Sequence, residues 1–173
     1  FERAGFKQDD KGALASTHTD KNKMPTISEK TVSFTQADPT VKKESTDFLG
    51  DFLTALTTPN NTKGAGVYLY NVAQKIPTVT KNNEQDILTA STNKYLVKVY
   101  VAQKSTGGLY IKGLVVNEGT VDTPGADKVD ATPGGSTGGS TSAMVFTNEY
   151  IAKNGSGGGD DNKPNPTDPA TYG

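Results

Sequence analysis

The chain offers few side chains whose types and spacing suit catalysis. It contains no cysteine and a single histidine, His18, which stands in a polar stretch. The absence of cysteine excludes disulfides and thiolate metal sites, and one imidazole leaves almost no route to a Ser–His–Asp triad or a multi-histidine site. We interpret His18 as a solvated loop residue. The sequence therefore predicts no turnover chemistry, no cofactor and no metal.

Two further groups of residues could bind a ligand, but an ordinary structural role also explains each of them. Asp160 and Asp161 are adjacent in the tail, but an EF-hand loop needs ligands at fixed positions that close on a glutamate. We expect a solvated acidic linker there. Four tyrosines on predicted strands could line a sugar-binding face, or could belong to an ordinary half-buried sheet face: Tyr68, Tyr70, Tyr95 and Tyr100.

The strongest structural signal is a period of two in β-branched and aromatic residues over 94–102. The same alternation occurs over 66–74 and again over 110–116, after the turn sequence Thr106-Gly107-Gly108. This period is typical of strands with one face in a core. We predict that 94–102 is an inner strand flanked by the other two runs.

Other segments complete the expected fold. Strands are predicted over 27–35 and 143–150, a short pairing over 87–90, and the end of a strand over 1–6. Apolar residues at helical spacing favour a short helix over 45–56, capped by Ser45 or Thr46, although two short strands would also fit. Residues 119–142 are rich in Gly, Ser, Thr, Pro and Asp, which predicts a long surface insertion.

Composition sets the class of protein. The 173 residues carry a net charge of −1, with 18 basic and 19 acidic side chains interspersed, so no basic patch for nucleic acid is expected. No apolar run approaches the roughly 20 residues that span a bilayer. We predict an all-β fold: an antiparallel immunoglobulin-like β-sandwich over 1–153, with long polar loops and at most one short helix, followed by a Gly/Pro/Asp-rich linker over 154–173.

Four motifs in order resemble the T-antigen-type backbone pilins of Gram-positive bacteria. They are GVYLYNVAQ at 66–74, TNKYLVKVYV at 92–101, LYIKGLVV at 109–116 and MVFTN at 144–148. The resemblance implies an immunoglobulin-like domain in the shaft of a covalently polymerised pilus. It also implies an internal isopeptide bond between a lysine of the first strand and the asparagine of the last.

Such a bond needs a buried neutral lysine amine, a carboxamide facing it and a protonated carboxylic acid that shuttles protons. By the resemblance, Asn148 occupies the asparagine position and Gln74 the position of the acid. A glutamine donates hydrogen bonds but cannot shuttle a proton. The resemblance places the lysine strand before Phe1, so Asn148 and Gln74 are the isopeptide candidates in this chain.

The resemblance further implies assembly by a sortase, which joins one subunit to an exposed lysine amine of the next. The lysine of the insertion, Lys128, is the candidate acceptor, and Lys98 is a weaker rival because it lies in the middle of a strand. The expected function is a structural shaft subunit on the bacterial surface, with other copies, sortase and minor pilins as partners. The alternative is an adhesin or stalk domain that binds a host glycan or protein.

Overall fold

A computed structural model of the chain describes the following residues: 1–7, 21, 24–35, 43, 45, 47–57, 64–129 and 144–153. The chain divides into two compact units. The first contains Phe1–Lys30, Thr46–Ala73 and Asn93–Val145, and the second contains Thr31–Ser45, Gln74–Thr92 and Phe146–Gly173. The predicted linker at 154–173 lies outside the described residues.

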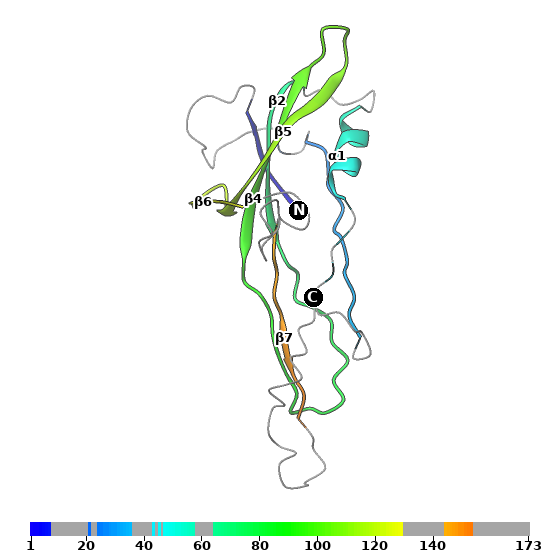
Figure 1. Cartoon of the computed structure of the whole chain (residues 1–173), viewed down its shortest axis with the longest axis vertical. Coiled ribbons are helices and arrows are strands. Elements are labelled where there is room, and N and C mark those ends of the chain that lie inside the picture. Colours follow the sequence, from blue (N-terminus) through cyan, green and yellow to red (C-terminus); the bar gives the residue numbers. More distant parts are fainter. Residues whose placement is uncertain are drawn as a thin grey trace. The chain divides into compact units, whose positions relative to one another are not determined.

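The first unit is built on a five-stranded antiparallel sheet (Figure 1). Its strands follow the order β1-β2-β4-β5-β6. Their bounds are Glu2–Lys7, Gly66–Ala73, Lys94–Gln103, Leu109–Gly119 and Pro124–Val129. β4 lies between β2 and β5, so the prediction of an inner strand with these two flanking runs is confirmed. The predicted turn after β4 is confirmed too, with Gly107 and Gly108 at φ of 89° and 85°.

One face of this sheet packs against a helix, and we call it the helix face. Partners in adjacent strands point to the same side of a sheet, which places Tyr68 with Val99 and Tyr70 with Val97 on this face. All four are fully buried. The Phe52 ring of the helix lies 5.3 Å from the Tyr68 ring and 5.9 Å from the Tyr70 ring, both edge-on. The helix face is therefore the main hydrophobic core of the unit.

The opposite face carries a smaller apolar cluster and several lysines, and we call it the lysine face. Its buried cluster contains Ala4, Val67, Leu69, Leu96 and Val121, with Tyr100 packed against it. The cross-strand register places Lys98 opposite Leu69, Lys128 opposite Asn117 and Lys7 opposite Val67. The alternation of β4 thus separates the tyrosines: Tyr95 belongs to the helix face and Tyr100 to the lysine face.

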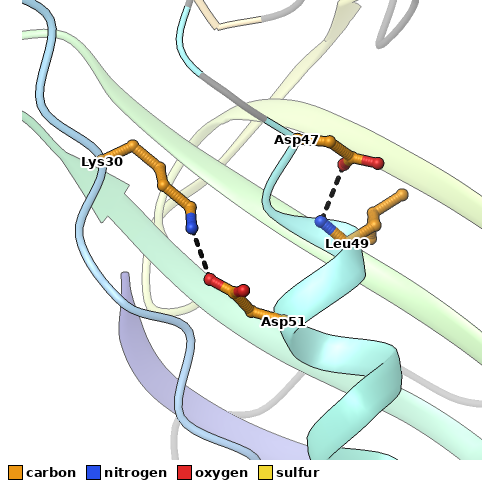
Figure 2. A network of polar contacts seen from close by, with 4 residues as sticks. All are labelled: Lys30, Asp47, Leu49 and Asp51. Atoms are coloured by element: carbon orange, nitrogen blue, oxygen red, sulfur yellow. Dashed lines mark hydrogen bonds and ion pairs between the residues drawn. The ribbon is translucent and has the colours of Figure 1, made fainter.

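The helix α1 spans Leu49–Leu56, which confirms the predicted helix and excludes the two-strand alternative. Its start differs from the prediction. The Asp47 side chain, just before the helix, accepts a hydrogen bond from the Leu49 N–H at 2.8 Å (Figure 2). Thr46, one of the two predicted caps, lies outside the described residues. An aspartate oxygen at this point satisfies an N–H group that the helix leaves free. Lys30 forms an ion pair with Asp51 in the first turn.

Part of the predicted insertion at 119–142 is instead a strand. β6 pairs with β5 through a tight turn in which Thr120 N–H donates to Thr123 C=O at 3.2 Å. Gly119 has a φ of 103°, and a Cβ there would lie 2.4 Å from the Thr123 oxygen, so the turn requires glycine. β5 is long enough for its C-terminal part to pair with β6, and the composition of 119–142 does not reveal this pairing. Residues 130–142 lie outside the described residues.

The second unit contains a two-stranded antiparallel sheet of β3, Ile87–Thr89, and β7, Glu149–Ile151. The predicted pairing over 87–90 is confirmed. The predicted strand over 143–150 is correct only at its end. In the first unit, the Tyr95 hydroxyl donates to the Val145 C=O at 2.9 Å and accepts from its N–H at 3.1 Å. The Tyr95 hydroxyl thus satisfies the backbone groups of Val145, which were expected to pair with another strand.

The prediction of a strand over 27–35 is wrong, because these residues pair with no described strand. Ile27 is buried, and Val32 and Phe34 are half-buried between exposed neighbours. The alternation therefore reports which side chains find apolar contacts along an extended segment, and not a hydrogen-bonded ladder.

The predicted fold class is confirmed: the described residues form antiparallel β-sheets and one short helix, consistent with an all-β, sandwich-like fold. No helix among the described residues is long and apolar enough to cross a membrane.

Candidate crosslink site at Asn148

Asn148 and Gln74 are 74 residues apart in sequence and in direct contact in the second unit. Gln74 follows the last residue of β2, and Asn148 precedes the first residue of β7. The Asn148 side chain is fully buried, while Gln74 is half-buried. The two candidates that the resemblance predicted are therefore brought together.

The two side-chain amides pair reciprocally. Gln74 Nε2 donates to Asn148 Oδ1 at 2.7 Å, and Asn148 Nδ2 donates to Gln74 Oε1 at 2.7 Å. The Ser91 N–H also donates to Asn148 Oδ1, at 2.8 Å. Each polar atom of the buried carboxamide thus has a partner, which is the condition for burying it without a large free-energy penalty.

The pair contains no group that could act as a nucleophile or transfer a proton. Both side chains are neutral amides, and neither gains or loses a proton near neutral pH. Among the described residues, neither a lysine amine nor a carboxylic acid is hydrogen-bonded to Asn148. The pair joins Gln74 to Asn148, both in the second unit, by hydrogen bonds alone.

A buried carboxylate that the sequence did not single out lies in the same unit. Asp86 is 3% exposed; its Oδ1 accepts from the Lys153 N–H at 2.7 Å, and its Oδ2 accepts from the Tyr150 hydroxyl. The Asn83 N–H donates to Oδ2 at 3.3 Å. The hydrogen bond from Lys153 is the largest cause that lowers the Asp86 pKa, followed by that from Tyr150, and together they outweigh the opposing effect of burial.

Asp86 fixes one end of the β3–β7 pair, where β3 begins and β7 ends. Its Lys153 contact follows β7, and the Asn83 side chain also donates to the Lys153 C=O, at 3.1 Å. The local signal was an aspartate three residues after an asparagine, just before a strand, which is common in turns. Sequence alone did not reveal its distant partners, Tyr150 and Lys153.

The candidate acceptor Lys128 is exposed, as predicted, but it lies on β6 rather than in a loop. Its rival Lys98 is half-buried on β4. Burial lowers the pKa of the Lys98 amine, and the positive charges of Lys128 and Lys7 lower it further.

The idea of one sugar-binding face lined by all four tyrosines is wrong. Tyr68 and Tyr70 are fully buried, Tyr95 is 4% exposed, and these three belong to the helix face. The Tyr70 hydroxyl donates to the Pro25 C=O at 2.6 Å, and burial is the main cause that raises its pKa. They are core residues, as the alternative interpretation proposed, whereas Tyr100 is half-buried on the lysine face.

Within the described part of the chain, no group of three or more His, Cys, Asp or Glu side chains could hold a metal ion. The chain matches no protein-family model and no curated protein. Its class therefore rests on the fold and the site: an all-β protein with antiparallel sheets and a buried carboxamide pair.

Proposed function

We propose that the chain is a structural subunit of the shaft of a Gram-positive surface pilus. The proposal is supported by four strand motifs in the order found in T-antigen-type backbone pilins. Three of these motifs fall on adjacent strands of one sheet, β2, β4 and β5. The subunit functions outside the cell, contacts other copies of itself, and is joined to them by a sortase that also links minor pilins.

One observation carries the proposal. Asn148 and Gln74 occupy the asparagine and acid positions of the resembled family, and their side-chain amides are hydrogen-bonded to one another at 2.7 Å. Neither residue type by itself suggests this pairing. A stalk domain of an adhesin could use the same fold, so the assembly test below is what separates the two functions.

Assembly is tested with the full-length protein in a Gram-positive host. Cell-wall extracts probed with an antibody to this chain are expected to show a ladder of covalent polymers that disappears when the sortase is deleted. A single monomer band in both strains would contradict the shaft function and favour the adhesin or stalk alternative.

The crosslink is tested separately by intact mass. Each isopeptide bond between lysine and asparagine releases one ammonia, a loss of about 17 Da. For the chain as printed we expect the mass of the sequence without loss, because Asn148 faces a glutamine and no described lysine is bonded to it. A loss of ammonia that disappears in Asn148→Ala would contradict this expectation.

A further inference from the structure

β5 is longer than the strand that pairs with its outer side. It spans Leu109–Gly119, but β6 pairs only with the part that begins at Val116. The residues Leu109–Val115 lie against β4 on one side and against no described strand on the other, and we call their free side the open edge of β5. Because β2 also reaches only Val101 of β4, the β4–β5 hairpin extends beyond both neighbouring strands (Figure 1).

The open edge carries backbone N–H and C=O groups that make no hydrogen bond. In an antiparallel sheet, some residues of a strand direct these groups toward one neighbouring strand and the residues between them toward the other. Within the described part of the chain, no hydrogen bond reaches the outward groups of Leu109–Val115. None of these residues is buried, so another chain can reach them. An unpaired edge of this length, which is typical of a whole strand, is a template for a further strand.

The outer strand on the same side of the sheet, β6, shows how an edge is protected. Pro124 has no N–H group, and Asp127 and Lys128 place charges of both signs along the strand. Proline and charged residues discourage the pairing of a further strand. The open edge of β5 contains no proline and one charged residue, Lys112, among apolar and aromatic neighbours. It is therefore better suited than β6 to accept a strand.

Lysines determine which strand the open edge can accept. Lys112 is exposed, and the register shift between β4 and β5 leaves it without a partner in β4. Lys104 is exposed at the tip of the hairpin. Neither lysine belongs to an ion pair among the described residues, and the sequence has no acidic residue between Asp86 and Glu118. Opposite charges on neighbouring strands attract, so this edge favours an acidic strand.

Two other occupants fit the open edge less well. Lys112 is the central residue of Leu109–Val115, so two copies of this edge paired antiparallel in full register would place two lysines opposite one another. Like charges in that position are destabilising. The segments 130–142 and 154–173 of this chain contain proline and many glycines but few apolar residues, a composition that is poor in strand formers.

We propose that the open edge of β5 binds an extended segment of another protein by β-strand addition, and that this segment alternates apolar residues with aspartate or glutamate. Its backbone pairs with the outward N–H and C=O groups of Leu109–Val115 and lies in line with β6. One acidic side chain lies beside Lys112, and a second lies near Lys104 at the tip of the hairpin. This interaction goes beyond the shaft function and does not depend on it.

Amide hydrogen exchange of the whole ¹⁵N-labelled chain, followed by NMR, tests whether the edge is open. In the free protein we expect the amides of Leu109–Val115 that donate to β4 to exchange slowly and the outward amides to exchange fast. Protection of the outward amides at every protein concentration would show that a segment of the same chain covers them. Protection that grows with concentration would show pairing with a second copy. Either result would overturn the proposal.

Binding is tested with the capped peptide Asp-Val-Glu-Val-Asp-Val-Glu. We expect it to protect the outward amides of Leu109–Val115 and to bind more weakly at higher salt. The peptide Asp-Pro-Glu-Pro-Asp-Pro-Glu has the same charge but lacks the N–H groups of the three valines, so it cannot form the ladder. The peptide Lys-Val-Lys-Val-Lys-Val-Lys keeps the alternation and reverses the charge. Both control peptides are expected to bind at least about tenfold more weakly.

Variants locate the site. Lys112→Glu is expected to weaken binding of the acidic valine peptide about tenfold and to strengthen binding of the lysine peptide, which an unfolded variant would not do. Lys94→Glu makes the same charge change at the exposed first residue of β4, at the end opposite the hairpin turn, and should bind the acidic peptide within about twofold of the parent. The proposal is overturned if the acidic valine peptide gives no protection, if either control peptide binds the parent equally well, or if Lys94→Glu weakens binding as much as Lys112→Glu.

Discussion

The side-chain amides of Gln74 and Asn148 close on one another through two hydrogen bonds of 2.7 Å. Each amide offers one donor and one acceptor to the other, so the pair is satisfied on both sides without any proton transfer. The pair connects the residue that follows β2 to the residue that precedes β7. It is thus a non-covalent connection between two neutral side chains.

Replacing Gln74 by leucine should destabilise the protein by about 1–3 kcal/mol, because it leaves the buried Asn148 Nδ2 without an acceptor. Asn148 Oδ1 would still accept from the Ser91 N–H. Urea denaturation measures the change in free energy of unfolding. Gln103→Leu, at the exposed end of β4, is the matched control and should change it by less than about 0.5 kcal/mol. Equal effects of the two variants would show that the amide pair contributes nothing specific.

The sequence predicted the sheet where side-chain alternation and pairing coincide, as in β2, β4 and β5. The prediction failed where a segment has only one of these two features. The segment 27–35 alternates in burial without a ladder, and β6 forms a ladder without an apolar pattern, because its Gly119 turn and the length of β5 determine its pairing. Asn148 and Gln74 were found through the resemblance. Asp86 was missed because its partners are distant in sequence.

Replacing Gln74 by glutamate should make stability depend on pH with a definite sign. The new carboxyl group faces Asn148 Oδ1, to which only its protonated form can donate, so its folded-state pKa is expected to rise above the ordinary value. A raised folded-state pKa means that stability is fully present at low pH and is lost as pH rises through that pKa. Urea midpoints at pH 4 and pH 7, relative to the parent, measure this. A variant that is equally stable relative to the parent at both values would contradict the prediction.

Asp86 should give the opposite pH dependence. Its hydrogen bonds from Lys153 and Tyr150 lower its pKa from the ordinary 3.8, so the ionised form stabilises the fold. That stability is present above about pH 4 and is lost as pH falls below 3.8 through the lowered folded-state pKa. Asp86→Asn should lower stability at pH 7 and reduce the further loss between pH 4 and pH 2. Glu84→Gln, on an exposed residue of the same turn, is the control.

Asn117→Leu should stabilise the protein, because it removes a buried oxygen that has no partner and adds apolar surface beside Leu96. The expected gain is about 1–3 kcal/mol, the usual penalty for an unsatisfied buried acceptor. Thermal unfolding measures it. A destabilised Asn117→Leu would mean that the oxygen has a partner in solution.

Lys128→Arg tests the acceptor of the proposed assembly. Sortase attack requires a neutral amine that the acyl-enzyme can reach, and Lys128 is exposed at the outer strand of its sheet. A guanidinium stays protonated and keeps the positive charge, so the variant removes the nucleophile while it preserves the local electrostatics. In the full-length protein, cell-wall extracts of Lys128→Arg should show monomer without the polymer ladder, whereas Lys104→Arg should polymerise like the parent. If the ladder persists in Lys128→Arg and disappears in Lys98→Arg, the half-buried lysine of β4 is the acceptor. A ladder that persists in both variants would mean that neither lysine is the acceptor.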